Sequence, residues 1–268
     1  MDLALRSPLL EVVDLGKRFE ERAGRGGALP VIAGMSFVVH EGEFVTVLGP
    51  SGSGKSTLLN IIAQIDGLTE GTIRLRGEPI LGKDTSKLDP GWRCQIGYVT
   101  QSDNLLPWRR LQENLLLPLR AQGRTDPTAL ARVSELIEMM GLCGFERYYP
   151  HELSGGMRKR ASLARTLVYD PPVILMDEPF GALDALTRAQ LHDDLLRLWS
   201  SKRKTILFVT HDVAEAIALG DRLLVLSRLP ARVVAEHVVD LPRPRRAGDL
   251  LTQPGFAQLY ARIHESLG

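Results

Sequence analysis

The stretch Gly49-Pro50-Ser51-Gly52-Ser53-Gly54-Lys55-Ser56-Thr57 decides the fold. It fits the pattern G-x-x-x-x-G-K-S/T, in which glycines let the backbone turn tightly and point several N–H groups at a phosphate. The pattern carries this meaning only between a strand and a helix. Both are predicted, because the β-branched run 43–48 precedes it and a helical pattern over 55–65 follows it. The alternative is a chance glycine-rich turn, and the strand-to-helix context disfavours it.

This loop predicts a nucleotide site with defined roles for its side chains. The backbone N–H groups gather at a helix N-terminus, where the helix dipole favours an anion. Lys55 is expected to reach the β- and γ-phosphates, and the Ser56 hydroxyl is expected to ligate Mg²⁺. A nucleotide and Mg²⁺ are therefore the predicted ligands of this loop. All nine residues from Gly49 to Thr57 are assigned to nucleotide binding.

Working outward from the loop, short apolar strands alternate with helical stretches. This alternation predicts an α/β fold with a largely parallel sheet. Between about Leu111 and Thr166 the pattern is helical, with an amphipathic run over 129–140 that puts Leu130, Val133 and Leu136 on one face. That block predicts an inserted helical subdomain. The expected strands are 72–76, 96–100, 173–176, 205–209 and 222–226, with helices at 186–199 and 254–267.

Two carboxylates follow a buried strand. The apolar run 173–176 delivers Asp177 and Glu178 at its carboxyl end, which is the edge where open α/β sheets bind ligands. Asp177 is expected to hold Mg²⁺, and Glu178 is placed to activate a water as general base. On its own, such a pair is usually a solvated strand end. The phosphate loop in the same chain favours the functional interpretation.

Composition excludes several other classes of protein. The chain has 268 residues, with 33 Lys plus Arg and 32 Asp plus Glu, giving a net charge of +1. It is too apolar and too balanced in charge to be disordered, and it lacks the basic surplus typical of nucleic-acid binding. No apolar run approaches the roughly 20 residues of a membrane-spanning helix. Cys94 and Cys143 are expected to be buried free thiols.

A second candidate anion site lies at Leu153-Ser154-Gly155-Gly156-Met157, ahead of a basic helix. The alternative is an N-capped helix that binds nothing. Together with the phosphate loop and the carboxylate pair, in this order and spacing, this segment resembles the signature of the ATP-binding cassette (ABC) ATPases. The signature usually ends in glutamine, and Met157 stands there instead. The resemblance extends from about Leu10 to Leu241.

Four further positions match minor motifs of that family. Gln101 matches the glutamine that reaches Mg²⁺ and the attacking water, although Thr100 replaces the usual aromatic before it. His211 matches the histidine that contacts the γ-phosphate, against the alternative of a structural histidine. Asp184 matches the loop that crosses between two subunits. Phe19 matches the aromatic residue that stacks on adenine, and the alternative for Phe19 is a strand residue in the core.

The resemblance implies a specific architecture and assembly. It implies a P-loop NTPase core with an N-terminal antiparallel β subdomain and an inserted helical subdomain. The ATP-binding domain then covers 1–241, with core 1–101 and 168–241 and helical subdomain 102–167, and an extension covers 242–268. Two cassettes face each other head to tail, so that Ser154, Gly155 and Gly156 of one copy close over ATP held by the other.

More narrowly, three segments resemble the nitrate/sulfonate/taurine importer family. That family implies separate integral-membrane permease subunits, an extracytoplasmic solute-binding protein, and a position at the cytoplasmic face of the bacterial inner membrane. Leu105, Leu106 and Trp108 are expected to help receive the permease, with burial as the alternative. Arg243, Arg245 and Arg246 are expected to lie in a solvated linker, with contact to anionic lipid headgroups as the alternative. The three segments are 104–108, 183–188 and 241–245.

Two other functions stay open on sequence grounds. One is a soluble cassette ATPase acting on ribosomes or DNA, which usually carries two cassettes or a long coiled coil. The other is a small-molecule kinase on the same phosphate loop, which has no need of the 153–157 segment or His211. No nucleic-acid partner is expected. The identity of the transported solute is not encoded in any motif of this chain.

Overall fold

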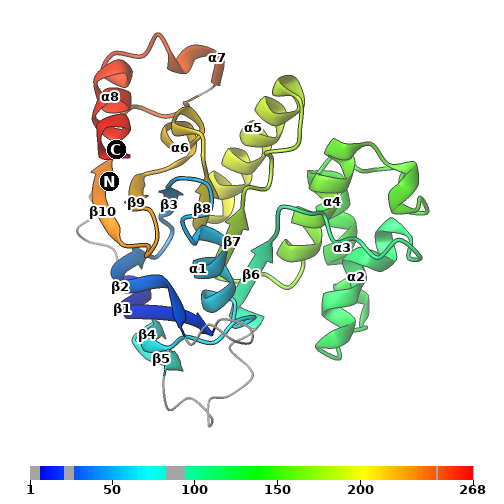
Figure 1. The fold of residues 1–268 in the computed structure, drawn as a ribbon. Helices are drawn as coiled ribbons and strands as arrows, with labels where there is room; N and C mark the ends of the chain where they lie inside the picture. The colour runs from blue at the N-terminus through cyan, green and yellow to red at the C-terminus, as the bar shows by residue number, and fades with distance from the viewer. Residues whose placement is uncertain (1–6, 21–26, 83–93, 246, 268) are drawn as a thin grey trace.

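The centre of the molecule is a largely parallel sheet (Figure 1). The structure is a computed structural model that describes residues 7–20, 27–82, 94–245 and 247–267. Strands follow the spatial order β10-β9-β3-β8-β7-β6, all parallel except β10, which pairs antiparallel with β9. The α/β class and the parallel sheet are thus confirmed. The bounds are β3 Phe44–Leu48, β6 Ile96–Val99, β7 Val173–Asp177, β8 Thr205–Thr210, β9 Arg222–Leu226 and β10 Val233–Val238.

Helices cover both faces of this sheet, which is why its central strands are continuous apolar runs. Side chains alternate along each strand, so Val45 and Val47 share a cluster with α1, while Phe44 shares another with α5. Helix α6 packs on β3 and β8 and contributes to a third cluster with the C-terminal helices. The bounds are α1 Lys55–Ile62, α5 Ala185–Lys202 and α6 Val213–Leu219.

An antiparallel sheet with the strand order β2-β1-β4-β5 lies beside the α1 face, as the family resemblance implies. Leu10 and Val12 of β1 and Met35 of β2 are fully buried or nearly so, and they join the same apolar cluster as α1. This shared cluster fixes the small sheet against the loop that precedes α1. The bounds are β1 Pro8–Glu20, β2 Ala28–His40, β4 Glu70–Leu75 and β5 Glu78–Gly82.

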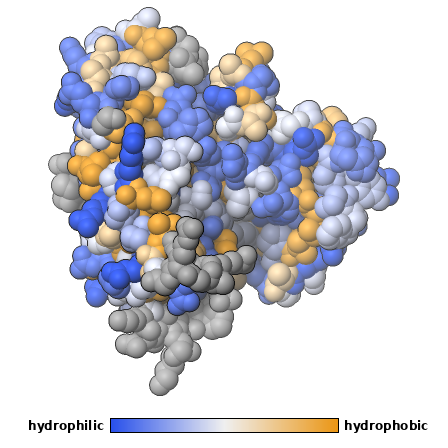
Figure 2. Space-filling view, in the orientation of Figure 1, coloured by the Kyte–Doolittle hydropathy of each residue, from blue (hydrophilic) through white to orange (hydrophobic). Residues whose placement is uncertain are grey.

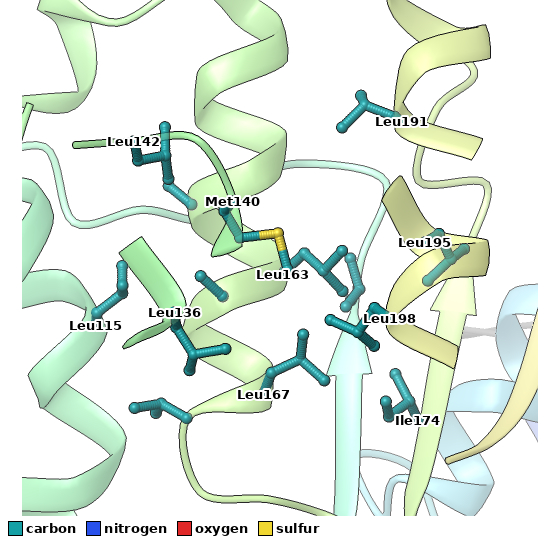
Figure 3. Packing of buried hydrophobic residues seen from close by; sticks show 14 of the residues in the cluster. Leu115, Leu136, Met140, Leu142, Leu163, Leu167, Ile174, Leu191, Leu195 and Leu198 are labelled. Carbon is teal, nitrogen blue, oxygen red and sulfur yellow. The ribbon is translucent and has the colours of Figure 1, made fainter. Parts of the chain in front are cut away.

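The helical block stands to one side of the sheet and shares its core (Figures 1 and 3). Figure 3 shows Leu163 and Leu167 of α4 between helical-block residues such as Leu136 and core residues such as Leu198. Of the residues on the predicted apolar face of the run 129–140, Val133 and Leu136 are buried, whereas Leu130 is 46% exposed. The domain boundaries at 101/102 and 167/168 stay predictions. The bounds are α2 Leu111–Ala121, α3 Pro127–Met139, η4 Pro150–Glu152 and α4 Gly155–Leu167.

Some predicted element ends were wrong by one to three residues. Helix α1 stops at Ile62 rather than Ile65, because Gln64 has φ 54° and the Ile65 and Asp66 N–H groups both donate to the Asn60 carbonyl. Strand β4 ends before Arg76, whose φ of 52° starts a turn. Cys94 and Cys143, expected to be buried, are both exposed free thiols.

No described helix combines the length and the apolar character that crossing a membrane requires. The face drawn in Figure 2 is a mixture of hydrophilic and hydrophobic residues, with hydrophobic residues gathered in patches rather than in one continuous surface.

The C-terminal extension is built into the core and is not a solvated linker. Arg245 is 4% exposed, and its guanidinium donates to the carbonyls of Ile217, Gly220, Val239 and Leu241. Burial lowers the pKa of Arg245 to about 10, so it stays charged at neutral pH. The expectation for Arg245 was wrong because the free carbonyls at the C-terminus of α6 attract a cation.

Arg243 joins the same arrangement, and Arg246 lies outside the described residues. The Arg243 guanidinium stacks on the Trp199 ring, 4.4 Å from its centroid, and donates to the Leu219 carbonyl and to Asp221. Two short helices then complete the third cluster, where Phe256, Leu259 and Ile263 are buried. The predicted final helix is therefore confirmed. The bounds are α7 Ala247–Leu250 and α8 Phe256–Ser266.

The Arg245 contacts predict a large stability effect. Arg245→Met keeps the aliphatic stem but leaves buried carbonyls without donors, so the free energy of unfolding should fall by about 2–3 kcal/mol in urea titrations followed by circular dichroism. Arg197→Met is the matched control, since the Arg197 side chain is 77% exposed. An unchanged unfolding midpoint for Arg245→Met would contradict a stabilising role for the Arg245 hydrogen bonds.

Candidate functional site

The phosphate-loop residues lie at the carboxyl edge of the central sheet. The loop leaves β3, which lies between β9 and β8, and ends where α1 begins at Lys55. Gly52 and Gly54 have φ values of 74° and 94°, a left-handed region that other residues adopt at a cost. A side chain at Gly54 would also meet Val31, with its Cβ 3.1 Å from Cγ1. The glycines are thus required by the turn itself.

A cavity of about 450 Å³ opens over this loop. It brings the loop together with Gln101, Asp177 and Glu178, which the sequence placed at the ends of other strands. Asp177 ends β7 and Glu178 follows it, while Gln101 comes shortly after β6; β7 lies beside β8, and β6 lies beyond β7 at the edge of the sheet. Parallel strands deliver them to one edge, as expected. The lining comprises Val31, Ser51, Gly52, Ser53, Gly54, Lys55, Ser56, Thr57, Gln101, Asp177, Glu178 and Leu229.

Lys55 and Ser53 are the buried polar side chains of the loop, and both are placed to interact with a bound phosphate. The Lys55 ammonium is buried and donates to the carbonyls of Gly49 and Pro50, both at 2.9 Å. Burial lowers the pKa of Lys55, and the nearby Glu178 and Asp177 carboxylates oppose that shift. The Ser53 hydroxyl is buried and has no hydrogen-bond partner within the described residues. Because an orphaned buried hydroxyl is costly, this atom fits a bound phosphate oxygen.

Asp177 lies at the end of β7, inside the cavity. Burial raises the pKa of its carboxyl group, and the neighbouring Glu178 raises it further. Hydrogen bonds from the hydroxyls of Ser56 and Tyr98 act in the opposite direction and favour the carboxylate. A hydroxyl and a carboxylate are hard oxygen ligands of the kind Mg²⁺ prefers. The chemistry of this donor pair therefore fits the predicted metal.

Glu178 is held in a strained backbone conformation. Its φ is 41°, which is uncommon for a residue with a side chain, and its N–H donates to the Val209 carbonyl at 3.0 Å. His211 follows the adjacent strand β8, and its Nδ1 lies 2.9 Å from the Glu178 carboxylate. The structure thus pairs two residues that were predicted separately. Strain of this kind clusters at functional sites, where surrounding contacts maintain it.

The second predicted anion site is not part of this cavity. Ser154 caps α4 by accepting from the Met157 N–H at 3.3 Å, and Asp184 caps α5 by accepting from the Thr187 N–H at 3.0 Å. The two caps pack closely, because a Cβ at Gly156 would lie 2.8 Å from the Thr187 methyl. Ser154, Gly155, Gly156 and Asp184 do not line the cavity over the phosphate loop. Within one chain, the two halves of the predicted site remain separate.

Phe19 projects from β1 with 40% of its surface exposed, so the alternative of a core strand residue is wrong. It does not line the 450 Å³ cavity. The Lys17 ammonium sits 4.6 Å from the centroid of the Phe19 ring and donates to the Gly67 carbonyl. Lys17 therefore contacts one face of the ring. Adenine stacking on Phe19 stays a prediction.

Three residues at the site escaped sequence analysis. Val31 and Leu229 line the cavity, although nothing in their sequence context distinguishes them from ordinary apolar residues. The Tyr98 hydroxyl donates to Oδ1 of Asn60 at 3.0 Å and also lies close enough to the Asp177 carboxylate to lower its pKa. Burial and the Asp177 charge both raise the pKa of Tyr98, so it remains a donor. The only sequence feature that could have indicated Tyr98 was its polar hydroxyl on the otherwise apolar strand β6.

Comparison with known proteins decides the family. The family described as ABC transporter matches residues 32–181, which is more than half of the chain. The chain belongs to the ABC transporter family. It is an ATPase of this family, with the α/β P-loop NTPase fold. The ABC assignment made from the signature segment and the phosphate loop is therefore confirmed.

Relatives in this family match nearly end to end. The aliphatic sulfonates import ATP-binding protein SsuB of Bacillus licheniformis is 42% identical over 94% of this chain and 93% of its own. The taurine import ATP-binding protein TauB of Burkholderia pseudomallei is 40% identical over 91% and 92%. The solved dimeric structure of the ABC transporter cassette MJ0796 has a TM-score of 0.74 and 33% identity, covering 86% of this chain and 99% of its own.

Tyr98 generates a prediction about pH. Tyr98→Phe removes a hydrogen bond that lowers the pKa of Asp177, so Asp177 will protonate at a higher pH. The acid limb of the ATPase rate profile should therefore move to higher pH. If the limb moves by about half a pH unit, the rate at a fixed pH on that limb should fall about threefold. Tyr169→Phe is the control, because the Tyr169 hydroxyl donates to the Ile96 carbonyl at the other end of β6. Superimposable profiles for Tyr98→Phe and wild type would refute the contact.

Proposed function

We propose that this chain is the ATP-hydrolysing subunit of an importer that takes up a small solute of the nitrate, sulfonate or taurine type through separate permease subunits. The observation that carries the proposal is the division of the site. One chain gathers the phosphate loop, Gln101, Asp177 and Glu178 in one cavity, and it holds Ser154 and Gly156 elsewhere. The relatives named for sulfonate and taurine import support the transport role.

In this proposal the phosphate-loop N–H groups, Lys55 and the Ser53 hydroxyl bind the phosphates of ATP. Ser56 and Asp177, with Gln101 beside them, would hold Mg²⁺, which when bound supplies positive charge to the phosphate oxygens. The pKa of Lys55 is lowered by burial, so contact with phosphate favours its charged form. Phe19 stacks on adenine, and Val31 and Leu229 line the cavity beside the phosphate loop.

Hydrolysis needs a base for the attacking water, and Glu178 is the proposed group. A water oxygen attacks the γ-phosphorus, the bond to the β–γ bridging oxygen breaks, and Glu178 takes a proton from the water. The His211 ring lies next to this base, because its Nδ1 is hydrogen-bonded to the Glu178 carboxylate at 2.9 Å. That contact fixes both side chains where charge develops on the γ-phosphoryl oxygens.

A second copy of the chain completes the site in this proposal. The α4 N-terminus of the partner, with Ser154, Gly155 and Gly156, supplies N–H donors to the γ-phosphate. Asp184 caps α5 directly beside that terminus, so the crossing loop and the donors move as one unit. ATP then holds two cassettes together and hydrolysis releases them, which is a switch able to move an attached permease.

The helical subdomain offers the proposed permease contact. Trp108 is 71% exposed and follows the Gln101 segment, whereas Leu105 is 7% exposed and belongs to the core. Burial, the alternative, therefore applies to Leu105 and not to Trp108. We place the subunit at the cytoplasmic face of the bacterial inner membrane, with an extracytoplasmic protein delivering the solute. No nucleic-acid partner is part of the proposal.

Glu178→Gln tests the divided site. It should lower ATP hydrolysis at least about a hundredfold while keeping ATP binding, and ATP should trap the variant as a dimer in analytical ultracentrifugation. Adding Ser154→Arg to Glu178→Gln should keep ATP binding but leave the protein monomeric. A dimer that forms equally well with Arg at position 154, or hydrolysis by Glu178→Gln near the wild-type rate, would overturn the proposal.

A further inference from the structure

The loop that carries His211 is held by side chains that no motif includes. His211 itself is 63% exposed at its side chain and hydrogen-bonded only through Nδ1 to Glu178 among the described contacts. An exposed ring of this kind is aimed chiefly by its backbone. Both of its chain neighbours, Thr210 and Asp212, hydrogen-bond to one residue, Glu215. The Thr210 hydroxyl donates to the Glu215 carboxylate, and the Asp212 carboxylate accepts the Glu215 backbone N–H.

Thr210 is the first link. It is the last residue of β8, 1% exposed, and its hydroxyl donates to Glu215 while accepting the Asp212 N–H at 3.0 Å. Asp212 in turn accepts the Glu215 N–H at 3.0 Å through its carboxylate, which caps α6. The chain therefore closes a small ring of hydrogen bonds around His211. The backbone at His211 is fixed on both sides.

His192 is the second link, and it comes from a different helix. Its Nε2 lies 2.7 Å from the Glu215 carboxylate, and the two side chains are 9% and 10% exposed. The His192 ring also packs edge-on against Phe180, with centroids 5.4 Å apart. His192 lies on α5, the helix that Asp184 caps. The ring of bonds around His211 is thereby tied to the helix that starts at the crossing loop.

We infer that Thr210, Glu215 and His192 are positioning residues for His211 in ATP hydrolysis, and that they couple its loop to helix α5. The inference rests on the proposed role of His211. Buried hydrogen-bond networks are rigid when every member is satisfied, and both Glu215 oxygens have partners here. Such rigidity holds His211 against Glu178. Small displacements from this geometry should lower the rate of ATP hydrolysis.

A pair of threonine variants tests the inference. Thr210→Val keeps the shape and loses the hydroxyl, so kcat should fall about tenfold while KM for ATP stays within about twofold. Thr210→Ser keeps the hydroxyl and should restore kcat to within about twofold of wild type. The matched control is Thr205→Val at the other end of β8, where a buried hydroxyl accepts the Gly42 N–H at 2.8 Å. It should lower the melting temperature without lowering kcat.

A second pair decides the outcome if Thr210→Val does not fold. His192→Phe removes the bond to Glu215 and should lower kcat, whereas His192→Gln can still donate and should keep it. The inference is overturned if Thr210→Val or a folded His192→Phe keeps wild-type kcat, or if Thr205→Val loses as much. If the wild-type chain hydrolyses no ATP under the same conditions, the proposed function fails as well. Normal wild-type turnover with unaffected variants rejects the positioning role alone.

Discussion

The parallel register of β3, β7 and β8 is the constraint on which the site depends. Leu48 at the end of β3 lies opposite Thr210 of β8, and Asp177 at the end of β7 lies opposite Val209. The residues that follow these three ends therefore share one edge of the sheet. A slip of one residue would exchange the side chains that pack in the α5 cluster for those that pack in the α1 cluster, so the fit of both faces enforces the alignment. Chemistry at this edge is a consequence of packing in the core.

Burial also sets the electrostatics of that edge. It lowers the pKa of Lys55 and raises that of Asp177, so each charged form is partly destabilised until an opposite charge arrives. In the proposed function, a magnesium nucleotide supplies both signs at once. The same logic applies at the far end of α6, where Arg245 satisfies carbonyls that the helix leaves free. Helix α6 is thus fixed at its N-terminus by Asp212 and at its C-terminus by Arg245, which comes from a distant part of the chain.

Sequence patterns predicted what is local. The phosphate loop, the strand ending in Asp177 and the cap at Ser154 each depend on neighbours within a few residues. Contacts between distant segments were missed. Tyr98 reaches Asp177 only because β6 and β7 are adjacent, and Arg245 is buried only because α6 ends beside it. Apolar periodicity put Leu130 on the same helix face as Val133 and Leu136, yet only the latter two are buried, because periodicity does not show how far a neighbouring element covers a helix.

The central claim is that one chain holds two unmatched halves of an ATP site, so that turnover requires two copies. The most direct test measures ATP hydrolysis per subunit over a wide range of protein concentration, at saturating ATP and Mg²⁺. The rate per subunit should rise with concentration and then level off as the dimer becomes complete. A rate per subunit that is independent of concentration, in a protein shown to be monomeric throughout, would contradict the account.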